Sequence, residues 1–244
     1  MKVANLKSVL LGAALVAGSI ALTPAAMAGG NDRMYEVTIQ NATLGQPLSP
    51  PVIATHTNAF QLFELGPVPS MADSDYDLYF ALATVAETGY PFHLLDEVAS
   101  ANGVWDAVAL PKDNGPMIPP VIFPGDSNST IISAAGNAKY LSVASMLGMT
   151  NDGFWAVRGA KLPRGVGDMT RVFANGYDAG SEANAETDTT VGGADGDNGA
   201  TGAGINTNGE GYIHVHYGVQ GIGDLSPAQD WRNPVVEVTI ERIE

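Results

Sequence analysis

The chain has 244 residues, no cysteine, and 26 acidic against 11 basic residues, which gives a formal net charge of −15 at pH 7. So acidic a surface disfavours nucleic acid and anionic membranes as partners and favours solubility and cation uptake. The lack of cysteine excludes a disulfide framework, so the packed core, alone or with a bound ion, has to supply the stability.

Residues 1–28 have the pattern of a secretory signal peptide. Two lysines precede the apolar run Val9–Leu22, and Ala26-Met27-Ala28 matches a cleavage site. The apolar run is short for a bilayer span, and a retained membrane anchor is the alternative. We therefore expect an exported protein, periplasmic or extracellular, with no transmembrane segment after cleavage. Residues 29–244 are expected to form one domain.

The N-terminal part of this domain is predicted to form strands and then helices. Met34–Gln40 alternates between apolar and polar residues, as a half-buried strand does. Val52–Thr55 follows closely spaced prolines and reads as a second short strand, and Phe60–Leu65 is expected to be extended. Within Tyr76–Ala101 apolar residues recur at helical spacing, so we expect one or two short helices there.

The central part returns to strand and turn patterns. Pro119–Gly125 combines β-branched residues with turn residues, and Lys139–Leu147 is an apolar run typical of a buried strand. The triplet Asn151-Asp152-Gly153 is a strong hairpin signal and precedes the apolar Phe154–Val157. We expect strands on both sides of this turn.

The C-terminal part contains a long polar segment and two alternating strands. Residues 183–210 are rich in Gly, Ala, Asn, Thr and Asp, which predicts a functional or disordered loop. Tyr212–Tyr217 and Val235–Ile243 alternate cleanly. The predicted order is strands, a small helical insertion and further strands, and it contains no βα repeat. This order indicates an all-β fold: an antiparallel β-sandwich with a small helical insertion.

Asp152, Asp178 and Glu182 are candidate metal ligands, because they lie in the turn-like segments Thr150–Asp152 and Tyr177–Glu182. Calcium takes several oxygen ligands at flexible geometry, which carboxylates on loops can supply. Turn formation alone is the alternative explanation for each aspartate. If the three carboxylates converge, a cation between them would offset their repulsion.

The segments Ser49–His56, Thr150–Asp152, Tyr177–Glu182 and Asp230–Val235, in this order, resemble the spondin amino-terminal domain. The resemblance spans Tyr35–Ile243 and implies an eight-stranded antiparallel sandwich similar to the calcium-dependent phospholipid-binding domains. It also implies a divalent-metal site on loops at one end and no catalytic activity.

By position, the resemblance implies calcium ligation by Asp152, Asp178 and Glu182. Glu182 stands where the family has an aspartate, so its carboxylate reaches farther. Tyr177 stands where the family usually has a tryptophan, and the cysteines of the animal members are missing. The disulfide framework of the animal members therefore does not transfer to this chain, and neither do their adhesive partners.

His214 and His216 form a second candidate constellation. On a strand, residues two apart point to the same face, so both imidazoles can meet one ion. With His56 nearby, they would form a nitrogen-rich site suited to zinc or copper. The alternative is that they hydrogen-bond within the sheet or pack beside Tyr212 and Tyr217.

The chain carries no Gly-x-Ser-x-Gly, His-Glu-x-x-His or phosphate-binding glycine-rich signature. We therefore expect no enzyme but a secreted calcium-binding, adhesion-like or surface-associated module, with an unidentified protein or a cell-surface or matrix ligand as partner. One alternative is a periplasmic metal-binding protein or metalloenzyme that uses His214 and His216. The other is a self-assembling structural protein in which an edge strand or the glycine-rich loop pairs with a neighbouring molecule.

Overall fold

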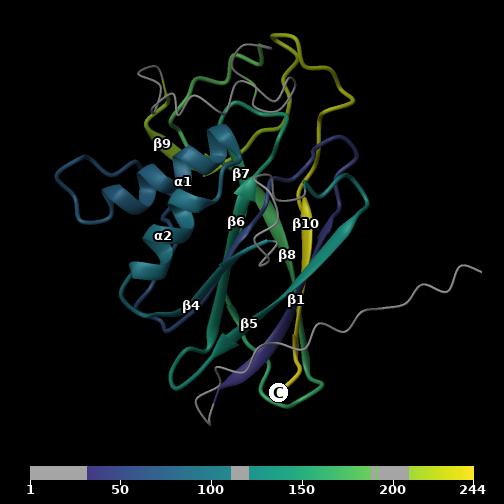
Figure 1. Ribbon diagram of the computed structural model, residues 1–244. Coiled ribbons are helices and arrows are strands. Elements are labelled where there is room, and N and C mark those ends of the chain that lie inside the picture. Colours follow the sequence, from purple (N-terminus) through teal and green to yellow (C-terminus); the bar gives the residue numbers. More distant parts are fainter. Residues whose placement is uncertain (1–31, 111–120, 188–190, 192–208) are drawn as a thin grey trace, which may run out of the picture.

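The computed structural model describes residues 32–110, 121–187, 191 and 209–244. The predicted signal peptide, residues 1–28, and most of the polar segment 183–210 lie outside the described residues. The described part is almost entirely antiparallel strand with two short helices (Figure 1). This confirms an all-β fold with a small helical insertion. Within the described ranges, no helix is both long and apolar enough to span a bilayer.

The strands are β1 (Arg33–Asn41), β2 (Val52–His56), β3 (Gly66–Pro67), β4 (Val104–Ala109), β5 (Ser127–Ala134), β6 (Tyr140–Met146), β7 (Gly153–Lys161), β8 (Met169–Asp178), β9 (Tyr212–Val215) and β10 (Val236–Arg242). The helices are α1 (Tyr76–Thr88) and α2 (Phe92–Ser100). Along the sheet the strands follow the order β4-β2-β6-β7-β8-β10-β1-β5, and β9 pairs with both β8 and β3.

The sheet curls until its two ends are linked through side chains. Thr55 of β2 donates from Oγ1 to the carbonyl of Ser133 on β5 at 2.6 Å. The backbone N–H of Ser133 donates in turn to Oδ2 of Asp106 on β4 at 2.9 Å. The nearly closed sheet encloses the main core, whose largest fully buried side chains include Trp155, Tyr35, Ile39, Ile53, Ile132 and Leu141.

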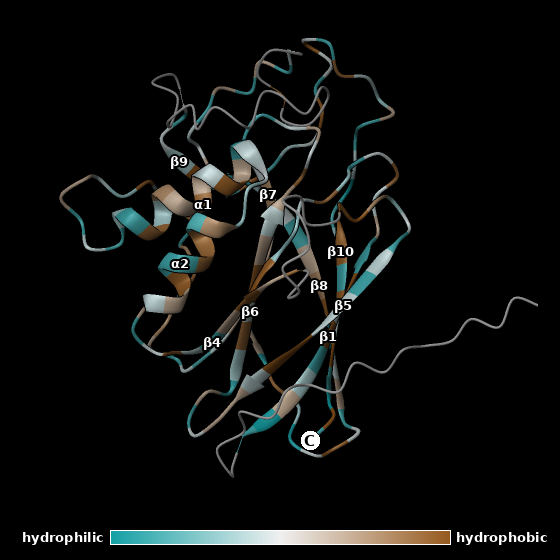
Figure 2. Ribbon diagram, in the orientation of Figure 1, coloured by the Kyte–Doolittle hydropathy of each residue, from teal (hydrophilic) through white to brown (hydrophobic). Residues whose placement is uncertain are grey.

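The burial pattern of each strand follows from what covers its two faces. In β1 and β10 every second residue is buried, because one face meets the core and the other meets solvent. β2 is buried throughout and β6 nearly so, because α1 and α2 cover their outer face (Figure 1). Apolar residues therefore occur on both helices and along these strands, and on the helices they alternate with hydrophilic residues (Figure 2).

The structure differs from the sequence-based expectation in several segments. Phe60–Leu65 is not a strand but an irregular loop that contributes Phe60, Leu62 and Phe63 to the core beneath the helices. In the described part of Pro119–Gly125, Ile122 forms only an isolated bridge with Leu48 before a turn. This loop buries its apolar side chains without pairing as a strand. The spacing of apolar residues in the sequence does not distinguish such a loop from a buried strand.

Three strands, β4, β5 and β8, have no clear signal in the sequence. In β8 only Val172 and Ala174 pack against the main core, and the large apolar Met169 and Phe173 are exposed. β5 begins with the polar run Ser127–Thr130. β8 is stabilised by hydrogen bonding to β7 and β10 on its two sides, and β5 by pairing with β1, rather than by a strong apolar stripe.

The connections of β6, β7, β8 and β9 meet at one end of the sheet. β6 and β7 form the predicted hairpin around the turn at Asp152. Gly153 at the start of β7 pairs with Asp178 at the end of β8, and Asp178 pairs with His214 on β9. In Figure 1 this end, near β9, lies opposite the C-terminus. Residues from three distant parts of the sequence are therefore neighbours there.

Candidate metal centre

Three acidic residues converge where these connections meet. Asp152 lies in the β6–β7 connection, Asp178 is the last residue of β8, and Glu210 precedes β9. One carboxylate oxygen of each lies within 4.8 Å of the other two. Asp152 and Asp178 are buried and Glu210 is exposed, so the group reaches from the interior to the surface. Such a group of oxygen donors can hold a metal ion.

The carboxylate of Asp152 is held in one orientation. Its Oδ2 accepts hydrogen bonds from the backbone N–H groups of Ser181 at 2.8 Å and Glu182 at 3.0 Å, and from the Ser181 hydroxyl at 3.2 Å. Its Oδ1 is buried and has no hydrogen-bond partner among the described residues. An acceptor oxygen left bare in the interior is costly unless a cation or donor meets it. Oδ1 is therefore free to serve as a metal ligand.

Asp178 is positioned by the turn that follows β8. Its Oδ1 accepts from the Gly180 N–H at 2.8 Å and its Oδ2 from Asn184 Nδ2 at 2.6 Å. Gly180 has φ of +67°, and a Cβ there would meet backbone atoms of Tyr212 at 2.5 Å, so this turn requires glycine. The Asn184 amide also donates to Glu210 Oε1 at 3.2 Å, which links the two acids.

The electrostatics of the buried pair favour a cation. Burial raises the pKa of Asp152 well above its ordinary value, and the charge of Asp178 raises it further. Burial also raises the pKa of Asp178, against the hydrogen bonds from Asn184 and Gly180. Two ionised carboxylates this close repel each other in a medium of low dielectric, and a divalent ion reverses that cost.

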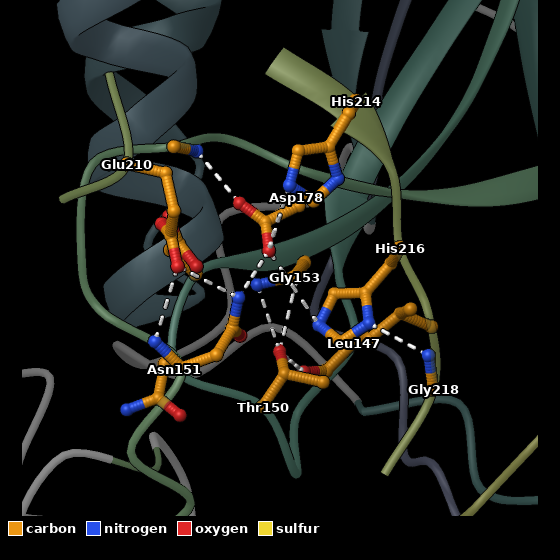
Figure 3. A network of polar contacts seen from close by, with 12 residues as sticks. Leu147, Thr150, Asn151, Gly153, Asp178, Glu210, His214, His216 and Gly218 are labelled. Atoms are coloured by element: carbon orange, nitrogen blue, oxygen red, sulfur yellow. Dashed lines mark hydrogen bonds and ion pairs between the residues drawn. The ribbon is translucent and has the colours of Figure 1, made fainter. Parts of the chain in front are cut away.

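His214 on β9 and His216 just after it face the same acid, as Figure 3 shows. His214 Nε2 and His216 Nε2 each lie 4.0 Å from Asp178 Oδ2. The two predicted constellations, acidic and histidine-based, are therefore one site. His56 takes no part in it, because its Nε2 is hydrogen-bonded to Ser142 Oγ at 2.8 Å in the sheet.

The hydrogen bonds of the two histidines assign them different roles. His214 Nδ1 donates to the Val215 carbonyl at 3.1 Å, which leaves a lone pair on Nε2 toward Asp178. His216 Nδ1 accepts from the Gly218 N–H at 3.0 Å, so its Nε2 must carry the hydrogen. Burial lowers the pKa of His216 to about 4. His214 can therefore ligate a metal through Nε2, whereas His216 is neutral and its Nε2–H, 4.0 Å from Asp178 Oδ2, makes no hydrogen bond among the described residues.

Glu182, which the family resemblance implies as a ligand, does not belong to the group of converging acids. Its backbone N–H supports Asp152. Its charge raises the pKa of Glu87 on α1. Glu210, which the sequence pattern does not indicate, is the third converging acid. The neighbouring Gly211 N–H donates to the Gly180 carbonyl at 2.8 Å, which holds Glu210 beside the turn that follows β8. That contact between distant segments has no local signature.

Comparison of the chain with protein-family models and with curated proteins gave no match in either case. The resemblance to the spondin amino-terminal domain therefore stays a prediction from the four quoted segments.

Glu87 makes stability depend on pH near neutrality. Burial raises its pKa from 4.5 to about 7, with an opposing hydrogen bond from Ser181 and a smaller contribution from the Glu182 charge. The folded protein keeps this proton where the unfolded chain has lost it, so stability falls as pH rises from 4.5 through 7. Because Glu87 is partly exposed, we expect Glu87→Gln to stabilise the metal-free protein at pH 8 by only about 1–2 kcal/mol.

Urea unfolding in EDTA at pH 5 and pH 8 measures this effect. The variant should gain stability over the native protein at pH 8 and gain much less at pH 5. Glu64→Gln, at an exposed acid, is the matched control and should change neither value. An equal gain at both pH values would show that Glu87 is ionised in the folded protein throughout this range.

Proposed function

We propose that the protein is a secreted calcium-binding module, adhesion-like or surface-associated and without catalysis, in which the ion orders the loops at one end of the sheet. The observation that carries the proposal is the bare, buried Oδ1 of Asp152, in a residue whose carboxylate lies within 4.8 Å of those of Asp178 and Glu210. Three carboxylates from three loops provide hard oxygen ligands of the kind calcium prefers. Backbone carbonyls and water would complete its coordination.

Export and surface association are supported by the sequence. Residues 1–28 have the pattern of a signal peptide, and the acidic, cysteine-free chain suits calcium binding outside the cytoplasm. The loops around the ion are the natural surface for a protein, cell-surface or matrix ligand, because the ion would order them. The resemblance to the spondin domain supports the same function.

The test is the metal content of protein purified without tag or chelator, together with melting curves before and after EDTA. We expect about one calcium ion per chain, a lower melting temperature in EDTA, and recovery on adding calcium. At a calcium concentration one hundred times the Kd, the ion would stabilise the fold by about 2.7 kcal/mol. Protein that contains no metal, and whose melting temperature is the same with calcium and with EDTA, would contradict the proposal.

A second candidate function is favoured by the orientation of His214. An imidazole that donates from Nδ1 to a backbone carbonyl and offers Nε2 beside a carboxylate is a common metal-ligand arrangement, and nitrogen ligands favour zinc or other transition metals over calcium. The protein would then be a metal-binding protein with a mixed imidazole and carboxylate site. Zinc or copper in the purified protein would favour this candidate.

The two histidines give a matched pair of variants for this question. If the ion is a transition metal, His214→Gln should lower its affinity at least about tenfold, since a direct ligand is lost. His216→Gln should have a smaller effect, because His216 Nε2 carries a hydrogen and cannot ligate in this arrangement. If the ion is calcium, neither substitution should change affinity by as much. Titration calorimetry with zinc and with calcium on each variant measures both.

A further inference from the structure

A second concave site lies on the sheet, with no residue in common with the metal centre. It is a cleft of about 440 Å³ between the end of β2, the loop that follows it, and the paired strands β6 and β7. The residues that line it are His56, Asn58, Phe60, Gln61, Leu62, Tyr140, Ser142, Arg158 and Gly159. Its volume is within the range of sites that bind small molecules.

The charge of the cleft is opposite to that of the chain. Arg158 contributes a full positive charge, and none of the residues that line the cleft is acidic, although the chain has a net charge of −15. The Arg158 guanidinium lies over the Phe63 ring, with Cζ 4.8 Å from the ring centroid, and 5.9 Å from that of Tyr177. Such contacts hold the flat face of the guanidinium and leave its N–H edges available.

Arg158 has no anionic partner within the described residues. Its side chain is exposed, and there it makes ring contacts but no hydrogen bond or ion pair. By contrast, Arg171 on β8 pairs with Glu237 at 2.9 Å, and Arg232 pairs with Asp230. A guanidinium held by aromatic rings at the wall of a cleft, with its donors unpaired, suits a planar anion such as a carboxylate.

The floor of the cleft is polar, neutral and already satisfied. His56 Nδ1 donates to the Thr57 carbonyl at 2.7 Å, so the Ser142 hydroxyl donates to Nε2 at 2.8 Å. The Gly159 N–H donates to Ser142 Oγ at 3.0 Å. Burial lowers the pKa of His56, which keeps the imidazole uncharged. Within the described part of the chain, Arg158 therefore supplies the only charge that a ligand would meet there.

The remaining walls are apolar or carry amides. Phe60 and Leu62 are buried side chains of the loop after β2, and the ring of Tyr140 stacks near His56 with centroids 6.0 Å apart. Asn58 and Gln61 are exposed at the rim. We propose that this cleft binds a small organic carboxylate, with the carboxylate on Arg158 and an apolar body against Phe60, Leu62 and Tyr140.

The test is a titration followed by protein NMR with benzoate and with benzyl alcohol, its neutral analogue of similar shape. The Gly159 amide is the reporter, because its N–H lies at the floor of the cleft. Benzoate should shift this amide in a saturable way, and benzyl alcohol should bind at least about tenfold more weakly, which corresponds to ~1.4 kcal/mol.

Arg158→Gln should weaken benzoate binding by a similar factor, and Arg164→Gln, at an exposed arginine that does not line the cleft, should leave it unchanged. Amide spectra identical to the native protein outside the cleft would show that both variants fold. The proposal is overturned if benzoate does not shift Gly159 at about 50 mM, far above the Kd of a specific site. It is also overturned if benzyl alcohol binds as well as benzoate, or if Arg158→Gln binds benzoate like the native protein.

Discussion

Asp152→Asn is expected to abolish metal binding and yet to stabilise the metal-free protein. Asparagine can keep an oxygen at the position of Oδ2, where Ser181 and Glu182 donate. It then places an NH2 group at the position of the bare Oδ1, and an NH2 group cannot ligate a cation. The same group can donate to the carboxylates of Asp178 and Glu210, and one of the repelling charges is removed.

The two effects have opposite signs, which makes the experiment specific. In saturating calcium the native protein should be more stable than Asp152→Asn by about 2–4 kcal/mol, the stabilisation from an ion at 100 to 1,000 times its Kd. In EDTA the order should reverse, because the native protein then keeps its buried repulsion. For a domain of this size, a change of this magnitude corresponds to roughly 5–10 °C in melting temperature.

Melting curves and bound calcium, each measured with calcium and with EDTA, test this prediction. Asp73→Asn is the control, since Asp73 is exposed and its carboxylate accepts hydrogen bonds from Ser70 alone. Two results would contradict the assignment of Oδ1 as a ligand. One is calcium bound by Asp152→Asn with native affinity, and the other is a variant less stable than the native protein in EDTA.

Glu210→Gln is expected to weaken metal binding far more than Glu182→Gln. Glu210 brings a carboxylate oxygen within 4.8 Å of the ligand oxygens of Asp152 and Asp178, and Glu182 contributes its backbone N–H to Asp152. Calcium affinity depends strongly on the charge of the ligand set. We expect at least about a tenfold loss, or ~1.4 kcal/mol, for Glu210→Gln, and less than about threefold for Glu182→Gln.

The pair is well matched, because both substitutions remove one negative charge near the same ion. General electrostatics would therefore affect both variants alike, and the difference between them reports direct ligation. Calcium titration by calorimetry at two ionic strengths measures it, since added salt screens the general effect more than the direct one. If Glu182→Gln has the larger effect, the ligand set implied by the family resemblance is correct and Glu210 is peripheral.

The fold shows which patterns are informative. In β1 and β10 apolar and polar residues alternate, because one face of each strand packs on the core and the other faces solvent. This two-residue period can be read directly from the sequence. β6 reads as a buried strand because helices cover its outer face. β8 is missed because its pairing with β7 and β10 stabilises it without a strong apolar stripe. Phe60–Leu65 is wrongly expected to be extended, because buried loops and strands share apolar residues.

The candidate site was predictable where a local turn marked it. Asp152 follows an asparagine and precedes a glycine, and Asp178 precedes Ala179-Gly180, so both could be recognised as loop carboxylates. The shared face of His214 and His216 followed from strand geometry. The difference between their ring nitrogens depends on the backbone groups at Val215 and Gly218, whose positions only the folded chain provides.

The sequence by itself determined the all-β class, the helical insertion, the hairpin at Asp152 and two of the three converging acids. These features follow from periodicities and turn residues that act over a few positions in the chain. Only the tertiary structure decided that Glu210 is the third acid, that the histidines belong to the same site, and that Arg158 lines a separate cleft. Each of these depends on strand pairing between segments far apart in sequence, and such pairing is set by the packing of the whole domain.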